Sequence, residues 1–131
     1  MEFIKIVLFC LCAAIGYGIL HDQITAHLCV EYFSIAHPPV FPTQSPTLLA
    51  LGWGIIATWW VGLPLGLLAG WAARIGNRRK LGLKDIRPLI FRLLIVMSGS
   101  AFFSGVLGAA LVASGHQALL DGWTQIIPRE K

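Results

Sequence analysis

Charged side chains are scarce in this sequence, and two long stretches have none. Asp, Glu, Lys and Arg make up 12% of the 131 residues, whereas hydrophobic residues make up 56%. Soluble domains average about 25% charged residues, so this composition argues against a soluble globular protein. The ranges 47–73 and 93–113 contain no ionisable group. That absence argues against a transporter or channel, because such proteins use intramembrane charges.

Cysteine and the common metal-binding motifs are equally sparse. Cys10 and Cys12 lie in an apolar run and Cys29 lies outside it. The sequence has no CxxC, HExxH or paired ExxH motif, so it lacks the ligand spacing of zinc-ribbon, redox, hydrolytic zinc and di-iron sites. A disulfide framework is not expected.

Long apolar runs are what the sequence has instead. The runs at 47–73 and 89–113 both exceed the roughly 20 residues that a helix needs to cross a bilayer core. A third run, at 3–20, is barely long enough. It lacks an Ala-x-Ala cleavage site, so we expect a retained helix, with a signal peptide as the alternative. The sequence predicts a single all-α membrane domain, 1–131, with transmembrane helices at about 3–20, 46–73 and 89–113.

Basic residues gather between the second and third of these helices. The cluster that sets the predicted topology comprises Arg74, Arg78, Arg79, Lys80, Lys84 and Arg87. The positive-inside rule predicts that the loop 74–88 and the N-terminus are cytoplasmic, with 21–45 and 114–131 outside. Such a cluster could also bind anionic lipid headgroups or nucleic acid. No aromatic residues interleave with the charges, so nucleic-acid binding is not expected.

Small residues recur at four-residue spacing on both long helices, which is typical of close helix packing in membranes. The glycines predicted to mark the packing faces are Gly54, Gly62, Gly66 and Gly70 on the second helix, and Gly105 and Gly108 on the third. We therefore expect these two helices to pack on each other or on other membrane helices, in a homo- or hetero-oligomer.

The predicted topology places all four histidines on the outer side, together with the acidic residues Asp22, Glu31 and Asp121. The candidate metal ligands are His21, Asp22, His27, Glu31, His37 and His116. If 22–36 forms an amphipathic helix, His27 and Glu31 lie one turn apart and could bind one transition metal ion. Haem ligation would need His37 and His116 on facing helices. Alternatively, these residues mark the boundary with water, and both interpretations stay open.

Two further segments complete the outer side. The range 37–46 reads HPPVFPTQSP, and its four prolines predict a stiff extended loop. In the tail 114–131, apolar residues repeat at helical spacing from Leu119 to Ile127. This spacing predicts an amphipathic segment along the membrane surface.

Four short motifs carry a resemblance: HDQIT at 21–25, CVEYF at 29–33, HPP at 37–39 and SPTLLALGWG at 45–54. The first half of the chain resembles a family of small bacterial inner-membrane proteins. The resemblance implies a bacterial inner membrane and no particular chemistry. Similar chains continue into a further apolar segment, so a shortened form of a longer protein is one expectation.

The sequence therefore supports two functional hypotheses. In the first, the protein is an accessory or structural membrane subunit that packs on partner helices through glycine-rich faces and presents a histidine-rich outer loop. In the second, it is a membrane-embedded metal or haem protein that uses the outer histidines and acids. No residue is predicted to be catalytic.

Overall fold

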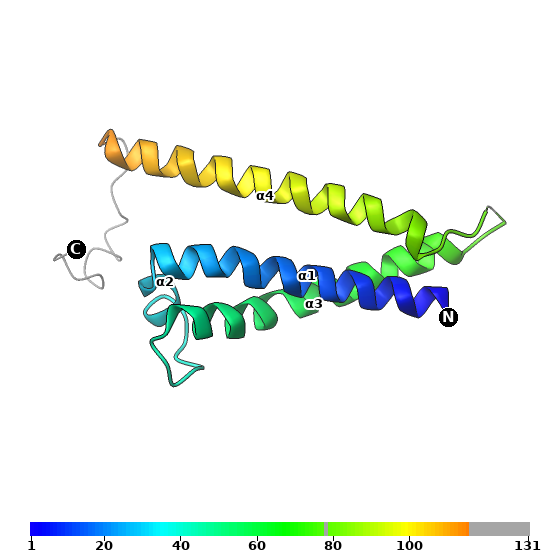
Figure 1. The fold of residues 1–131 in the computed structure, drawn as a ribbon, viewed down its shortest axis with the longest axis horizontal. Helices are drawn as coiled ribbons and strands as arrows, with labels where there is room; N and C mark the ends of the chain where they lie inside the picture. Colours follow the sequence, from blue (N-terminus) through cyan, green and yellow to red (C-terminus); the bar gives the residue numbers. More distant parts are fainter. Residues whose placement is uncertain (78, 116–131) are drawn as a thin grey trace.

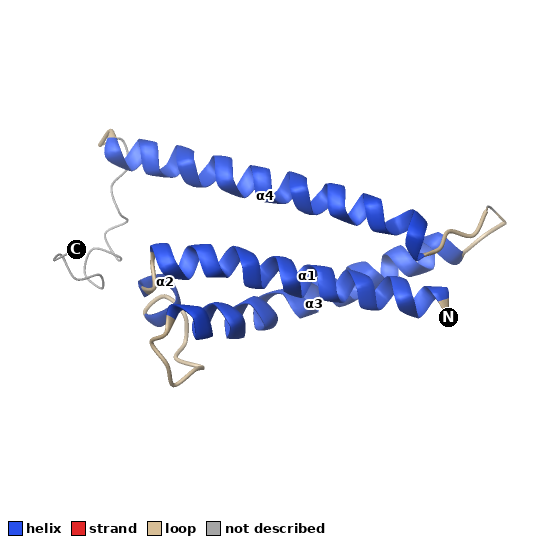
Figure 2. Cartoon of the chain, viewed as in Figure 1, coloured by secondary structure: helices blue, strands red, loops and turns tan. Residues whose placement is uncertain are grey.

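The computed structural model describes residues 1–77 and 79–115, and these residues form helices and loops without strands. In chain order the helices are α1 (Glu2–Leu28), the short α2 (Glu31–Ser34), α3 (Pro46–Arg74) and α4 (Leu83–Ala113). Figures 1 and 2 show that the long helices α1, α3 and α4 are joined at their ends. The predicted all-α membrane fold is confirmed. The predicted amphipathic tail lies outside the described residues.

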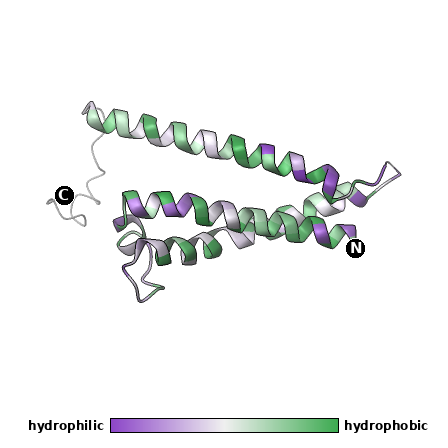
Figure 3. Cartoon of the chain, in the orientation of Figure 1, coloured by the Kyte–Doolittle hydropathy of each residue, from purple (hydrophilic) through white to green (hydrophobic). Residues whose placement is uncertain are grey.

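By length and composition, α1, α3 and α4 could each cross a membrane. Hydrophilic residues gather towards the ends of the helices and in the loops, whereas the bodies are mostly apolar (Figure 3). The start of α1 and the α3–α4 loop lie at one end, and α2 lies at the other (Figure 1). The molecule therefore has two polar ends separated by an apolar layer, as a multi-pass membrane protein requires.

All three long helices extend beyond their predicted ranges, α3 by a single residue and α1 and α4 by more. α3 spans Pro46–Arg74, one residue more than predicted; Ser45 is its N-cap, but the Ser45 side chain makes no capping hydrogen bond. α1 continues from residue 20 to Leu28, since polar residues can extend a helix beyond the apolar layer. α4 begins at Leu83 and not at residue 89. Its earlier start is stabilised by two carboxylates that accept backbone N–H groups at its start.

The condition of a continuous helix over 22–36, on which the proposed pairing of His27 with Glu31 rested, is not met. α1 ends at Leu28, and Cys29 leaves the helical region with φ −150° and ψ 85°. The chain then turns over the end of the bundle, where Phe33 is only 3% exposed and packs with Ala26 and Ala50. Burial of the Phe33 ring between α1 and α3 favours this break over a straight helix.

The core is a paired layer of α1 and α3, which contact each other far more than either contacts α4. The two helices cross in Figure 1. One buried cluster, Ile6, Cys10, Ala73 and Ile86, lies near the α3–α4 loop, and another, Ala26, Phe33, Leu49 and Ala50, lies at the opposite end. α4 contributes Ile86 to the first cluster and packs against it through Leu83 and Ile90. The Phe91 ring of α4 also meets the Phe9 ring of α1 edge-on, with the ring centroids 5.9 Å apart.

Candidate functional site

The glycine ladder of α3 faces α1. A Cβ atom built at Gly54 would lie 2.6 Å from Ile19 Cα, and one at Gly62 would lie 2.6 Å from Ala14 Cβ. At Gly66 the nearest atom is the Val7 carbonyl oxygen at 2.9 Å, and at Gly70 it is in the Phe3 ring at 3.0 Å. These distances are shorter than side chains tolerate. The four glycines therefore let the two backbones approach closely.

Sequence reasoning did not identify α1 as the partner of this ladder. The signal was present, because α1 carries its own small residues at four-residue spacing, Cys10, Ala14 and Gly18. A Cβ atom at Gly18 would collide with the Thr58 side chain and with the Gly54 carbonyl oxygen of α3. The small faces of α1 and α3 thus match each other.

The small residues of α4 have no such partner in the described chain. A Cβ atom at Gly105 or Gly108 would meet nothing within 4 Å, and no residue in the apolar window of α4 is buried. Of the two predicted possibilities, packing of α3 and α4 on each other is not found in the described residues, because α1 covers the small face of α3. The other predicted possibility, a helix outside this chain, stays a prediction for α4.

A groove of about 580 Å³ separates α4 from the second half of α1. Its α1 wall includes Leu20, Ile24 and Leu28, and its α4 wall includes Phe102 and Val106. Small residues of α4 also line it, namely Ser98, Ala101, Gly105 and Ala109. His21 and Tyr17 contribute the larger polar groups. The walls of the groove are therefore mostly apolar, and several of the α4 side chains that line it are small.

Among the predicted metal ligands that the structure describes, the sequence neighbours His21 and Asp22 contact each other. His21 Nδ1 lies 3.2 Å from Asp22 Oδ1. His27 donates from Nδ1 to the Gln23 carbonyl oxygen at 2.7 Å. The helix break between α1 and α2 separates His27 from Glu31, so they are not one helical turn apart. Within 1–77 and 79–115, no group of three or more His, Cys, Asp or Glu residues could hold a metal ion.

His37 belongs to an aromatic cluster that the sequence analysis missed. Its Nδ1 donates to the Tyr32 carbonyl oxygen at 2.7 Å. Its ring centroid lies 4.6 Å from that of Trp53 and 5.6 Å from that of Phe33. Phe41 meets Trp53 edge-on. These contacts attach the proline-rich loop to α3. His116, the expected haem partner of His37, lies outside the described residues, so haem binding stays a prediction.

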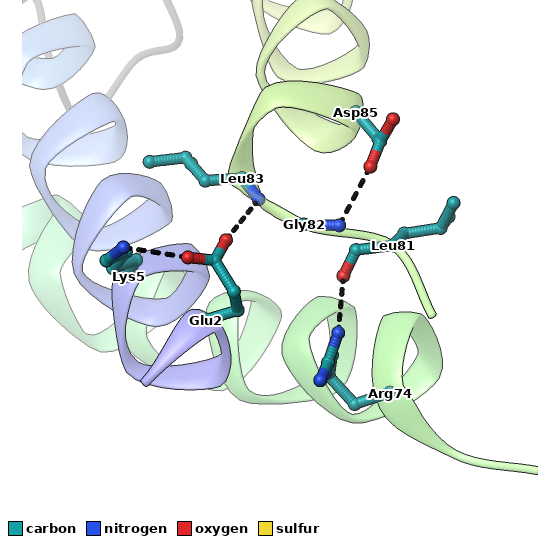
Figure 4. Close-up of polar contacts among 7 residues, drawn as sticks. All are labelled: Glu2, Lys5, Arg74, Leu81, Gly82, Leu83 and Asp85. Atoms are coloured by element: carbon teal, nitrogen blue, oxygen red, sulfur yellow. Dashed lines mark hydrogen bonds and ion pairs between the residues drawn. The ribbon is translucent and has the colours of Figure 1, made fainter. Parts of the chain in front are cut away.

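At the other end of the molecule, Glu2 connects α1 to the start of α4 (Figure 4). Glu2 Oε1 accepts a hydrogen bond from Lys5 Nζ at 2.7 Å, and Oε2 accepts one from the Leu83 N–H at 3.0 Å. A carboxylate at this position satisfies a free N–H and interacts favourably with the positive end of the α4 dipole. The start of α1 is thereby fixed beside the basic loop.

The basic loop wraps its cations around both helix ends. Lys80 Nζ donates to the Arg74 and Gly76 carbonyl oxygens at 2.7 and 2.6 Å, at the end of α3. Asp85 accepts the Gly82 N–H at 2.9 Å and faces Arg79 at 3.4 Å. A cavity of about 640 Å³ lies among these residues. Its charged lining is Glu2, Lys5, Arg74, Arg79, Lys80, Lys84, Asp85 and Arg87. Arg78, also predicted to set topology, lies outside the described residues.

No protein-family model, curated protein or solved structure is detectably similar to this chain.

Proposed function

We propose that this multi-pass membrane protein is an accessory or structural subunit that binds a transmembrane helix of a partner protein. The binding surface is the groove between α1 and α4. The observation that carries the proposal is the difference between the two sets of small residues. Those of α3 are covered by α1, whereas Gly105 and Gly108 of α4 have open space beside them.

The groove has the chemistry of a helix-binding surface. Leu20 and Ile24 on one wall, and Phe102 and Val106 on the other, are apolar. A surface that contacts only lipid tails does not require small residues, whereas a surface that another helix approaches closely does require them. Gly105 lies among such residues in the groove. The expected occupant is therefore an apolar helix without charged side chains on its contact face.

The proposal also assigns a location and an orientation. We propose a bacterial cytoplasmic membrane, with the loop 74–88 in the cytoplasm. The basic residues of that loop support this orientation. The hydrogen bond from the Leu83 N–H to Glu2 joins the start of α1 to this loop. At the opposite end of α3, His27 Nε2 lies 3.5 Å from Thr47 Oγ1. The basic loop and His27 are thus separated by the length of a membrane-spanning helix.

Photo-crosslinking in native membranes tests the groove. A photoreactive amino acid at Phe102, which lines the groove and is 75% exposed, should attach to a second polypeptide of different mass. The matched control is Leu68 of α3, which is 61% exposed and does not line the groove. The adduct at Phe102 should disappear when Gly105→Leu fills the groove.

Three outcomes would contradict the proposal. Attachment at Phe102 to lipid alone would mean that the groove is simply a lipid-facing surface. Attachment to a second copy of the same chain would indicate a homo-oligomer and not an accessory subunit. An adduct that survives Gly105→Leu would show that the attached polypeptide lies elsewhere on the surface.

A further inference from the structure

We propose that the cavity between the start of α1, the end of α3 and the start of α4 binds a phosphate group, carried by the headgroup of an anionic phospholipid. Its location is independent of the groove proposed for a partner helix, because the two sites lie at different ends of α4 and share no lining residue.

The charges around this cavity do not balance. Six cations line it, Lys5, Arg74, Arg79, Lys80, Lys84 and Arg87, against two carboxylates, Glu2 and Asp85. The lining charge is therefore 6 − 2 = +4. Both carboxylates already accept backbone N–H groups at the start of α4, Asp85 from the N-cap residue Gly82 and Glu2 from Leu83. The excess positive charge therefore favours the binding of an anion at this cavity.

Two of the cations are available for such an anion. Lys84 and Arg87 are exposed on the first turns of α4, and neither forms an ion pair with a described residue. The Arg87 guanidinium lies 5.5 Å from the centroid of the Phe91 ring, which limits its orientations. A guanidinium can bind two phosphate oxygens at once, and a nearby ammonium adds a compact positive charge.

The position of the cavity favours a lipid over a soluble phosphate. It lies where three candidate membrane-spanning helices begin or end. Directly beside it is the buried apolar cluster that contains Ile6 and Ile86. Basic pockets between transmembrane helices, at the level of the headgroups, are typical binding sites for anionic lipids. The volume of about 640 Å³ is within the range of pockets that hold small ligands.

The positive-inside rule explains why the loop carries a net positive charge but not how its charged side chains are arranged. The following experiment distinguishes an effect of net charge from binding at this cavity. Retention of anionic phospholipid by the purified full-length protein would be measured by native mass spectrometry after titration with a phosphatidylglycerol or cardiolipin. A cation close to such a headgroup contributes roughly a fivefold factor in affinity. Lys84→Gln and Arg87→Gln should each weaken binding about fivefold, and the double variant about 30-fold.

Arg92→Gln is the matched control, because it removes the same charge from α4 at a residue that does not line the cavity. It should change the affinity less than twofold. Equal weakening by Arg92→Gln and Arg87→Gln would overturn the site, because only net charge would then matter. Millimolar inorganic phosphate should not displace the lipid. Displacement by phosphate alone would assign the cavity to a soluble phosphate compound and overturn the lipid assignment. Equal retention of neutral phosphatidylcholine would overturn both.

Discussion

Replacing Gly54 with alanine adds one methyl group at the closest approach of α1 and α3. The added Cβ would lie 2.6 Å from both the N and the Cα of Ile19 and 2.9 Å from the Gly18 carbonyl carbon. All three are backbone atoms, so a change of side-chain rotamer cannot relieve the contact. α1 must move away locally, which separates the matched small faces.

The expected cost follows from overpacking. Extra methyl groups in a packed core typically cost about 1–3 kcal/mol. Gly105→Ala provides the comparison, since its Cβ would meet nothing within 4 Å. There, alanine should be neutral or stabilise the helix by up to about 1 kcal/mol, because it reduces backbone entropy in the unfolded chain. The two variants are therefore predicted to differ by about 1–4 kcal/mol, with Gly54→Ala the less stable.

Unfolding by denaturing detergent, followed by the fluorescence of the five tryptophans, measures this difference. Both variants would be compared in the same mild detergent and lipid. Equal stability of Gly54→Ala and Gly105→Ala would refute the assignment of the α3 glycines to the α1 interface.

Three further predictions concern other parts of the molecule. Gly62→Ala should destabilise the α1–α3 pair, because the added Cβ would lie 2.6 Å from Ala14 Cβ. Adding Ala14→Gly should recover at least half of the lost stability. A double-mutant cycle that shows no coupling between the two positions would contradict this contact. His37→Ala should accelerate proteolysis within 35–45, because the His37 ring joins this loop to Trp53; unchanged cleavage would show that the loop is held by other contacts. A reporter that is active only in the periplasm should be inactive when fused at Lys80, and activity there would reverse the proposed orientation.

The helical fold could be predicted from sequence because the length of an apolar run is a direct physical requirement for crossing a bilayer. The range of α3 came out within one residue, since Pro46 favours a helix start and Arg74 follows the last apolar residue. The ends of the other helices were harder. Hydropathy detects where a helix leaves the apolar layer. α1 instead continues through polar residues to Leu28, and α4 starts at Leu83, whose N–H donates to the Glu2 carboxylate.

Helix pairing could not be derived from spacing alone. All three long helices carry small residues four apart, and nothing in one sequence says which two faces meet. The structure distinguishes them, because α1 covers Gly62 of α3 while Gly105 of α4 stays open. The basic cavity was equally hidden. The charge cluster was visible in the sequence. Glu2 and Lys5 lie far from it in the sequence, however, and only the fold brings them from the start of α1 into the lining of the cavity.

The same limit applies to the histidines. Their predicted grouping relied on a continuous helix, and the break at Cys29 separates His27 from Glu31. Burial of Phe33 against Ala26 and Ala50 is a tertiary effect that local periodicity does not contain. Metal analysis of the purified protein tests the metal hypothesis. If that hypothesis is correct, the protein binds a metal ion, and changing His27 and Glu31 to alanine should abolish the binding.

The most direct test of the central claim is the mass of the complex extracted from membranes in mild detergent, before and after Gly105→Leu. We predict that the unmodified protein carries a second, different polypeptide in stoichiometric amount, and that Gly105→Leu releases it while the α1–α3 pair stays folded. A mass of this chain with lipid alone, unchanged by Gly105→Leu, would contradict the account.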